Sequence, residues 1–306
     1  MIPGFKTKKK LGVGIDIGSK LTKIIQLTKG PGSKEQIGFM GYLEANPEEK
    51  NYENHLATYL EQHGLKGKQA ISSLEDPSLK IRKIELPKMP ESDLKEAIKF
   101  KMRDVIDGTI SDYIIRYSIL EAPQVGAKII NYVGYAIKKE SVKNLSKLLE
   151  KCNLTPSFIE PAIISLSAAV ENIYPSENEW VGFADLGVKK SFFGINGKNR
   201  FHFSRPLHGI SLSHILSPEE YHQKLAVEIQ NTLDTFSVTF KIDQLDRIFI
   251  VGGGGSVDLA NYLSTNLAIK TIFFNPIEEL NLSDEQKALA KKTGHLFAHA
   301  LALARV

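Results

Sequence analysis

The feature that most constrains the fold of this chain is a strand–turn–strand unit that occurs twice. Residues 11–27 read LGVGIDIGSKLTKIIQL, in which apolar residues alternate on both sides of a turn that carries Asp16 and Gly18. The later stretch GFADLGVKKSFFGI places Asp185 and Gly187 in the same positions, 169 residues further on. A repeated hairpin with a carboxylate at its tip predicts two related domains that face each other across a cleft.

The residue types at the two turns indicate a phosphate site. Glycine lets the backbone approach a bulky anion and direct its amides at it. Aspartate beside a phosphate would repel it unless a hard divalent cation lies between them, and Mg²⁺ is held in that way by carboxylates, water and substrate phosphates. We therefore predict that Asp16 and Asp185 bind Mg²⁺ through water and that Gly18 and Gly187 lie at the phosphates.

Other polar residues of the two hairpins suit the same ligand. Ser19 could give a hydroxyl or an amide to a phosphate oxygen, and Lys23 could give a positive charge. Ser191 keeps a hydroxyl six residues after the second aspartate. Lys23 could equally be a solvent-facing strand residue, and both aspartates could be simple turn residues, because turns favour aspartate. The repetition at the ends of two apolar strands favours the metal–nucleotide role.

A glycine run follows a third apolar strand in RIFIVGGGGSVDLANYL, residues 247–263, where Ser256 can cap the next helix. The four glycines are Gly252, Gly253, Gly254 and Gly255. Backbone without side chains could hold a flat adenine ring or a ribose. Such a run alone is weak evidence, since it is often only a tight turn, but two Asp-x-Gly hairpins followed by the run form a stronger pattern.

Strands and helices interleave along the chain, which predicts the α/β class. We expect strands over 11–17, 21–27, 36–43, 69–74, 79–86, 113–120, 129–137, 156–159, 181–185, 191–196, 200–205, 247–251 and 270–274. We expect helices over 48–63, 91–106, 140–152, 161–173, 218–240, 257–267 and 283–304, with Ser92 as the N-cap of the second. The polar link 175–178 is the expected boundary between two lobes, because single cores stop growing near this chain length.

Composition excludes several classes of function. The first 30 residues, with the lysine-rich tail 6–10, carry a charge of +6 and the rest carry −2, so no domain offers a basic face for nucleic acid. The lone Cys152 excludes an internal disulfide, and the eight histidines show no metal-ligand spacing. We expect no signal peptide, and the longest uncharged run, 206–218, is too short and polar to span a bilayer. A cytoplasmic protein without direct membrane insertion is predicted.

The order of first hairpin, connecting helix, second hairpin and glycine run resembles the actin-like ATPase superfamily. SFIEPAIISLSAA at 157–169 is similar to the first connecting helix, where an acidic or amide residue often positions the attacking water. Glu160 occupies that place, although it could simply be exposed before the proline that follows.

Within this superfamily, residues 11–304 resemble the PilM family of type IV pilus assembly proteins. The resemblance is carried by DIGSKLTK at 16–23, KIRKIELPKMPESDLKEAIKFKMRDVI at 80–106, EIQNTLDTF at 228–236 and IVGGGGSVDLANYLSTNLAIKT at 250–271. Glu228, the first residue of the third stretch, would bond the ribose or lie on the helix surface.

The resemblance implies an actin-like two-lobe fold with duplicated ribonuclease-H-like domains and an extra small subdomain in the first lobe. It places the first lobe at 1–175, the inserted partner-binding subdomain at about 69–137, and the second lobe, with a reduced small subdomain, at 176–306. It implies ATP and Mg²⁺ as ligands and the cytoplasmic N-terminal tail of a PilN-like bitopic inner-membrane protein as partner. The pilus assembly ATPase and further copies of the chain are other partners that it allows.

The sequence departs from the family at the second hairpin, where Lys189 and Lys190 replace small or hydroxyl residues. They are either solvated turn charges or groups that intrude on the phosphate turn. We therefore expect ATP binding with weak or absent ATPase activity.

These observations predict a cytoplasmic ATP-binding scaffold of a type IV pilus, or of a related type II secretion machine, recruited to the inner membrane by its partner. The affinity for the partner would depend on the nucleotide. A small-molecule kinase is one alternative, although we find no general base beyond Asp16 and Glu160. An FtsA-like division protein is another, but we expect no C-terminal amphipathic membrane helix after the last predicted helix, which reaches residue 304.

Overall fold

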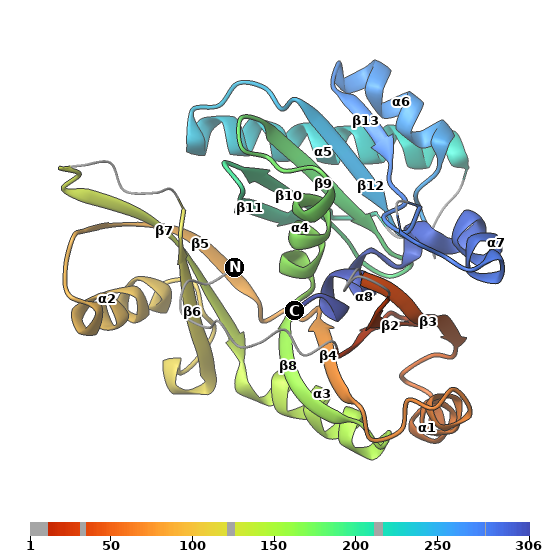
Figure 1. Ribbon diagram of the computed structural model, residues 1–306. Coiled ribbons are helices and arrows are strands. Elements are labelled where there is room, and N and C mark those ends of the chain that lie inside the picture. The colour runs from red at the N-terminus through yellow and green to blue at the C-terminus, as the bar shows by residue number, and fades with distance from the viewer. Residues whose placement is uncertain (1–11, 31–34, 121–125, 211–216, 279) are drawn as a thin grey trace.

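The computed structural model describes residues 12–30, 35–120, 126–210, 217–278 and 280–306, and it shows an α/β protein with two lobes (Figure 1). The lysine-rich tail lies outside the described residues. The sheet of the first lobe consists of β1 (Val13–Ile17), β2 (Leu21–Lys29), β3 (Glu35–Glu44), β4 (Gln69–Leu74) and β8 (Thr155–Pro161). That of the second consists of β9 (Trp180–Leu186), β10 (Ser191–Gly197), β11 (Arg200–Pro206), β12 (Arg247–Val251) and β13 (Lys270–Phe273).

The two sheets have the same topology. Their strand orders are β3-β2-β1-β4-β8 and β11-β10-β9-β12-β13. In each lobe three consecutive strands form two antiparallel hairpins. A fourth strand pairs in parallel with the first strand of these three, and a fifth pairs in parallel with the fourth. The duplication that the repeated hairpin predicts is therefore present in the whole sheet.

The helices occupy corresponding places in the two lobes. They are α1 (Tyr52–Gln62), α3 (Lys139–Lys151) and α4 (Ala162–Ile173) in the first half of the chain, and α5 (Pro218–Phe240), α6 (Val257–Leu267), α7 (Asp284–Thr293) and α8 (Ala298–Ala304) in the second. Helices α1 and α3 cover the outer face of the first sheet, and α5 and α6 cover that of the second (Figure 1). No described helix is long and apolar enough to cross a membrane.

A third, smaller sheet of β5 (Lys80–Pro87), β6 (Tyr113–Ile119) and β7 (Ile129–Lys138) projects from the first lobe together with α2 (Glu91–Arg103) (Figure 1). Only α6 stands between the equivalent strands of the second lobe. The predicted start of this inserted unit at residue 69 is wrong, because β4 pairs with β1 in the first-lobe sheet. The unit defined by the strand pairing begins at Lys80.

The apolar side of α2 packs on the sheet of the inserted unit. Leu94, Ile98 and Met102 are buried there, as the helical spacing predicts. Ser92 is not the N-cap, because the helix begins at Glu91 and Pro90 precedes it as the cap. The helix predicted over 48–63 also begins later, at Tyr52.

The predicted C-terminal helix over 283–304 is wrong, because the chain breaks between α7 and α8 at the short 3₁₀ turn Gly294–Leu296. Gly294 lies so close to the Asn275 side chain that a Cβ there would overlap it. The break lets the chain turn, and Phe297 and Leu301 pack with Ile25 on the inner face of the first sheet. Residues after the predicted lobe boundary therefore belong to the core of the first lobe.

Helices α4 and α8 lie next to each other between the two sheets (Figure 1). Helix α4 follows the first-lobe sheet in sequence but packs on the second, while α8 follows the second and packs on the first. At the closest approach, the backbone of Ala300 on α8 leaves no room for a side chain at Gly14 on β1. This exchange of helices joins the lobes.

Replacing Gly14 by alanine should lower the free energy of unfolding by about 1–3 kcal/mol, the usual range for overpacking a core. The new methyl group would overlap with the backbone of Ala300 and Ala304, which cannot rotate away as a side chain can. The matched control Gly12→Ala, at the residue just before the same strand, meets mainly the flexible end of Ile71 and should cost less. Urea denaturation measures the three stabilities. Wild-type stability of Gly14→Ala would show that α8 is not held against β1.

Candidate functional site

Asp16, at the end of β1, forms a buried ion pair with Lys23, its partner on β2. The Lys23 Nζ lies 2.6 Å from Asp16 Oδ2, and the two side chains are 12% and 13% exposed. Ser73 Oγ on β4 donates to Asp16 Oδ1 at 3.4 Å. Burial alone would raise the pKa of Asp16, but Lys23, His299 and the hydrogen bonds together lower it. Asp16 is thus ionised at neutral pH, and the solvent-facing alternative for Lys23 is wrong.

Asp185, at the end of β9, is bonded to His299 of α8. The two groups are 3.0 Å apart, and because a carboxylate only accepts, the His299 Nε2 carries the hydrogen. His299 Nδ1 lies 2.7 Å from Ser165 Oγ on α4. That hydroxyl also donates to the Ala162 carbonyl at 2.8 Å, which leaves its oxygen to accept from Nδ1. The imidazole therefore has carboxylate and hydroxyl acceptors for both of its nitrogens.

Sequence reasoning missed His299, which lies between the two hairpins. Burial by itself would lower its pKa, but Asp185 and Asp16 raise it above the ordinary value. The signal in the sequence is a lone histidine inside the apolar run AHALALA. Its use could not be predicted, because the break before α8 decides which lobe the helix contacts.

Glu160 lies on β8, two strands away from Asp16 in the same sheet. Ile15 pairs with Ser72 and Glu160 with Ser73, so β1, β4 and β8 carry their polar residues to one edge of the sheet. Burial raises the pKa of Glu160 to about 7, and His299 opposes part of that rise. A carboxyl group with such a pKa can take up a proton near neutral pH. Its catalytic role remains a prediction.

The turn of the second hairpin reaches the first lobe. Lys189 Nζ lies 2.8 Å from Oε1 of Glu48, in the segment between β3 and α1. Burial raises the pKa of Glu75, the residue after β4, and the nearby Lys190 partly opposes this. These two lysines were predicted to be solvated or to intrude on a phosphate. Both lysines are exposed, in agreement with the first alternative, and both lie near acidic residues of the first lobe.

The small residues of the second hairpin have separate roles. Gly187 closes the turn against the Lys190 carbonyl, where a Cβ would overlap. Ser191 is buried and its Oγ has no hydrogen-bond partner within the part of the chain that the structure describes. In the first hairpin, Gly18 donates its amide to Leu21 at 3.0 Å, and Ser19 is partly exposed beside it.

The glycine run packs against the second hairpin. Gly252 has φ +87°, and a Cβ there would lie 2.5 Å from Asp185 Oδ1. The amide of Gly254 donates to the Leu186 carbonyl at 2.8 Å, and that of Gly255 to Gly252 at 3.0 Å. The close packing around Gly252 and Gly254 is enough to explain why glycine is needed there. Adenosine binding by the run, including Gly253, remains a prediction.

Two residues on α5 lie near this part of the second lobe. Tyr221 is so close to Gly254 that a Cβ on the glycine would overlap its hydroxyl. Glu228, seven residues further along, accepts from the His208 amide at 3.2 Å and so ties α5 to the segment after β11. Its predicted contact with a ribose is not tested.

The carboxylates do not fit a directly coordinated Mg²⁺. This ion requires a nearly ideal octahedron of oxygen ligands, whereas Asp16 is paired with Lys23 and Asp185 with His299. No group of three or more His, Cys, Asp and Glu residues in the described ranges is arranged to hold a metal. The water-mediated role that the sequence predicts for the two aspartates remains a prediction.

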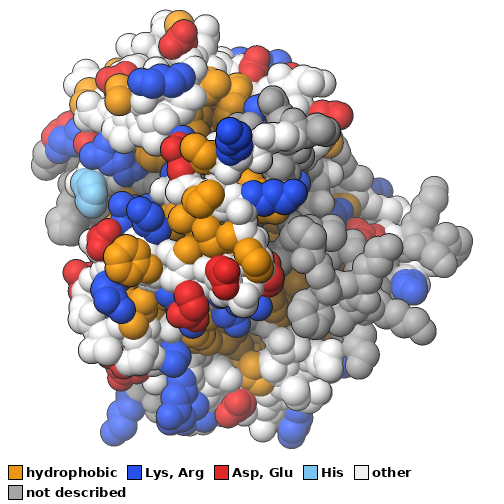
Figure 2. Space-filling view, turned by 90° about the vertical axis from the view of Figure 1, so that its left-hand side faces the viewer, with side chains coloured by type: hydrophobic (Ala, Val, Ile, Leu, Met, Phe, Trp, Pro, Cys, Tyr) orange, Lys and Arg blue, Asp and Glu red, His pale blue; other side chains and the backbone are white. Residues whose placement is uncertain are grey.

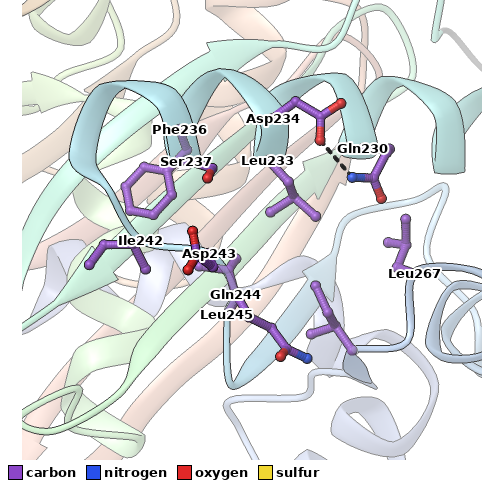
Figure 3. A pocket seen from close by; sticks show the side chains of 11 residues that line it. Gln230, Leu233, Asp234, Phe236, Ser237, Ile242, Asp243, Gln244, Leu245 and Leu267 are labelled. Carbon is purple, nitrogen blue, oxygen red and sulfur yellow. Dashed lines mark hydrogen bonds between the residues drawn. The ribbon is translucent and has the colours of Figure 1, made fainter.

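A separate cavity of about 320 Å³ lies in the second lobe, between the C-terminal half of α5 and the segment after it (Figure 3). Leu233 and Phe236 line it together with Gln230 and Asp234, whose side chains are hydrogen-bonded at 2.8 Å. None of the predicted site residues lines this cavity. It is distinct from the cleft between the hairpins.

Comparison with solved structures defines the class of the fold. The PilM-PilN type IV pilus biogenesis complex is similar with a TM-score of 0.80 and 17% identity, over 97% of this chain and 98% of that one. An actin-like ATPase fold protein of Bacteroides thetaiotaomicron has a TM-score of 0.47 and 13% identity, over 95% and 99%. The cytoplasmic domain of EpsL, from the type II secretion system of Vibrio cholerae, has 0.46 and 11%, over 87% and 97%. The likeness to the first of these structures over nearly the whole chain confirms the predicted two-lobe α/β fold.

The sequence itself is similar to a protein family over its last third. A profile of the type IV pilus assembly protein PilM matches residues 211–306. A search of curated proteins finds no match. Together with the structural likeness over nearly the whole chain, the profile confirms the resemblance to PilM.

Reversing the charge of Glu48 should loosen the contact between the lobes. Exposed ion pairs contribute at most about 1 kcal/mol, so Glu48→Lys should destabilise the protein by no more than that. Adding Lys189→Glu should restore the loss, because the pair is then reversed. A double-mutant cycle by urea denaturation measures the coupling. The exposed neighbour variant Glu49→Lys is the control, and a coupling of zero would show that Lys189 and Glu48 act independently.

Glu160 should make stability depend on pH. The folded protein keeps the Glu160 proton up to about pH 7, while the unfolded chain releases it near its ordinary pKa of 4.5. The folded state thus binds more protons between these values, and stability should fall as pH rises through this window. Glu160→Gln should flatten that part of the slope, whereas the exposed control Glu49→Gln should not. Denaturation at several pH values tests this, and equal slopes for all three proteins would contradict it.

Proposed function

We propose that this chain is a nucleotide-binding scaffold of a type IV pilus, or of a related type II secretion machine. ATP would bind between the two Asp-x-Gly turns. The cytoplasmic N-terminal tail of a PilN-like bitopic protein would bind elsewhere and recruit the chain to the inner membrane from the cytoplasm. The observation that carries the proposal is the likeness to the PilM-PilN complex over 97% of this chain.

Several contacts support a phosphate ligand between the hairpins. The Lys23 ammonium lies over the first turn, 2.9 Å from where a Cβ of Gly18 would stand. At the second hairpin, Ser191 offers a buried hydroxyl without a partner among the described residues. A phosphate could accept from both kinds of donor. Lys189, paired with Glu48, holds the second turn against the first lobe, and we infer weak or absent ATPase activity from that constraint.

The exchange of α4 and α8 could couple nucleotide binding to the affinity for the partner. A ligand that contacts both turns contacts both lobes, and each lobe is packed on a helix that comes from the other half of the chain. Binding would fix the angle between the lobes. An effect on partner affinity requires that the partner prefer one such angle.

The inserted unit is the proposed partner surface. Figure 2 faces this side of the molecule and shows hydrophobic side chains at several places among charged ones. Phe100 on α2 is 63% exposed and Ile129 at the start of β7 is 61% exposed. In this proposal the two exposed apolar side chains are anchors for the partner. The other apolar side of α2 is unavailable, because it packs on the unit's own sheet.

Phe100→Asp should weaken partner binding at least about tenfold, or ~1.4 kcal/mol. The probe is a labelled peptide with the sequence of the cytoplasmic tail of a PilN-like bitopic protein from the same organism. Val238→Asp is the matched control, since Val238 is 72% exposed on α5 in the other lobe. Fluorescence anisotropy with and without ATP measures both parts of the proposal.

Three outcomes are informative. Equal binding by wild type and Phe100→Asp would move the partner surface away from α2. An affinity that ATP does not change would contradict the nucleotide-sensitive part alone. No binding of the peptide to wild type would contradict the scaffold itself.

A further inference from the structure

Both cleft aspartates already have positively charged or hydrogen-donating partners from the protein. Lys23 lies 2.6 Å from Asp16, and His299 lies 3.0 Å from Asp185. All four side chains are at least largely buried, so water screens these contacts poorly. In an actin-like cleft the expected partner of such carboxylates is a metal ion that also holds the phosphates.

The two protein groups stand where the phosphate turns are. Lys23 lies at the Gly18 turn, close to the position that a Cβ would take there. His299 has two partners from elements packed in the second lobe, Asp185 on β9 and Ser165 on α4. Its ring also lies against Phe192, with 6.1 Å between the ring centres, on the strand that leaves the second turn. If either group moved away, a largely buried carboxylate would be left without its partner.

A metal ion bound directly by these carboxylates would have to displace existing bonds. Direct coordination by Asp16 would require Lys23 to move away, and coordination by Asp185 would require the same of His299. A triphosphate meets less obstruction, because the repulsion from each aspartate is already offset by the adjacent protein group. Removal of the metal should therefore change the affinity for a nucleoside triphosphate only slightly.

We propose that Lys23 and His299 replace the divalent cation in this cleft, so that a nucleoside triphosphate binds without Mg²⁺. The proposal rests on the proposed function, in that it takes nucleotide binding between the hairpins as given. It differs from the prediction made from the sequence, in which Asp16 and Asp185 hold Mg²⁺.

Calorimetric titration of the full chain with ATP tests the proposal, once in excess Mg²⁺ and once in excess EDTA. The expected affinities agree within about threefold, less than 1 kcal/mol. Binding in Mg²⁺ but not in EDTA would overturn the proposal and leave the proposed function intact. No binding in either buffer would overturn nucleotide binding itself, and the proposal with it. Mn²⁺ titrated alone and followed by electron paramagnetic resonance should show no bound ion.

Two variants should make ATP binding depend on Mg²⁺. His299→Gln keeps a donor for Asp185 but has no charge, and Lys23→Met keeps the length of the side chain without the ammonium. In EDTA each should bind ATP at least about tenfold more weakly than wild type, and Mg²⁺ should restore most of the loss. Lys20→Met, at the exposed lysine of the same turn, is the control and should bind ATP equally in both buffers.

The variants also separate a structural role from the proposed one. Loss of binding that Mg²⁺ does not restore, in a variant with a wild-type thermal transition, would overturn the substitution of a metal by these groups. If His299→Gln fails to fold, Lys23→Met alone decides, because it changes the other hairpin. Binding by both variants in EDTA at wild-type affinity would also overturn the proposal.

Discussion

Helix α8 lies directly on β1, and the backbone of Ala300 comes so close to Gly14 that no side chain fits between them. In return, α4 leaves the first lobe and packs on the second sheet. Each lobe thus completes its core with a helix from the other half of the chain, and a lobe separated from its partner would expose that apolar face to water. The positions of the two hairpins relative to each other depend on this exchange, because Asp185 and Ser165 reach the same histidine of α8.

The charged groups between the two hairpins are arranged in pairs. A buried carboxylate is unfavourable unless it is paired, and the loss of one partner leaves the other unpaired. Here Lys23 pairs with Asp16, and His299 is bonded to Asp185. Lys189 forms a further ion pair between the lobes, with Glu48. The polar groups that a nucleotide would be expected to organise are therefore held in place before any ligand binds.

The duplication is close in topology and incomplete in chemistry. Both sheets place Asp-x-Gly at the same turn, but the first hairpin supplies its own cation, Lys23, and the second takes its partner from α8. The inserted unit makes a second difference, since it occupies a place that only α6 fills in the other lobe. Exposed apolar residues of that unit, such as Phe100, then lie on one lobe only. In the scaffold that we propose, the two sheets share one topology, but the partner site lies on the inserted unit of one lobe only.

Local pattern by itself determined most of the elements and the repeat. The alternation around Asp16 and Asp185, the glycines at both turns and the helical spacing of Leu94, Ile98 and Met102 all reflect short-range geometry, which the sequence encodes directly. The tertiary structure decided what these residues contact. The break at Gly294 depends on a distant Asn275, and it alone brings His299 between the lobes. Contacts between residues far apart in the chain leave no periodic signal, so the charge partners of the two aspartates were settled only when both sheets and the two exchanged helices had packed.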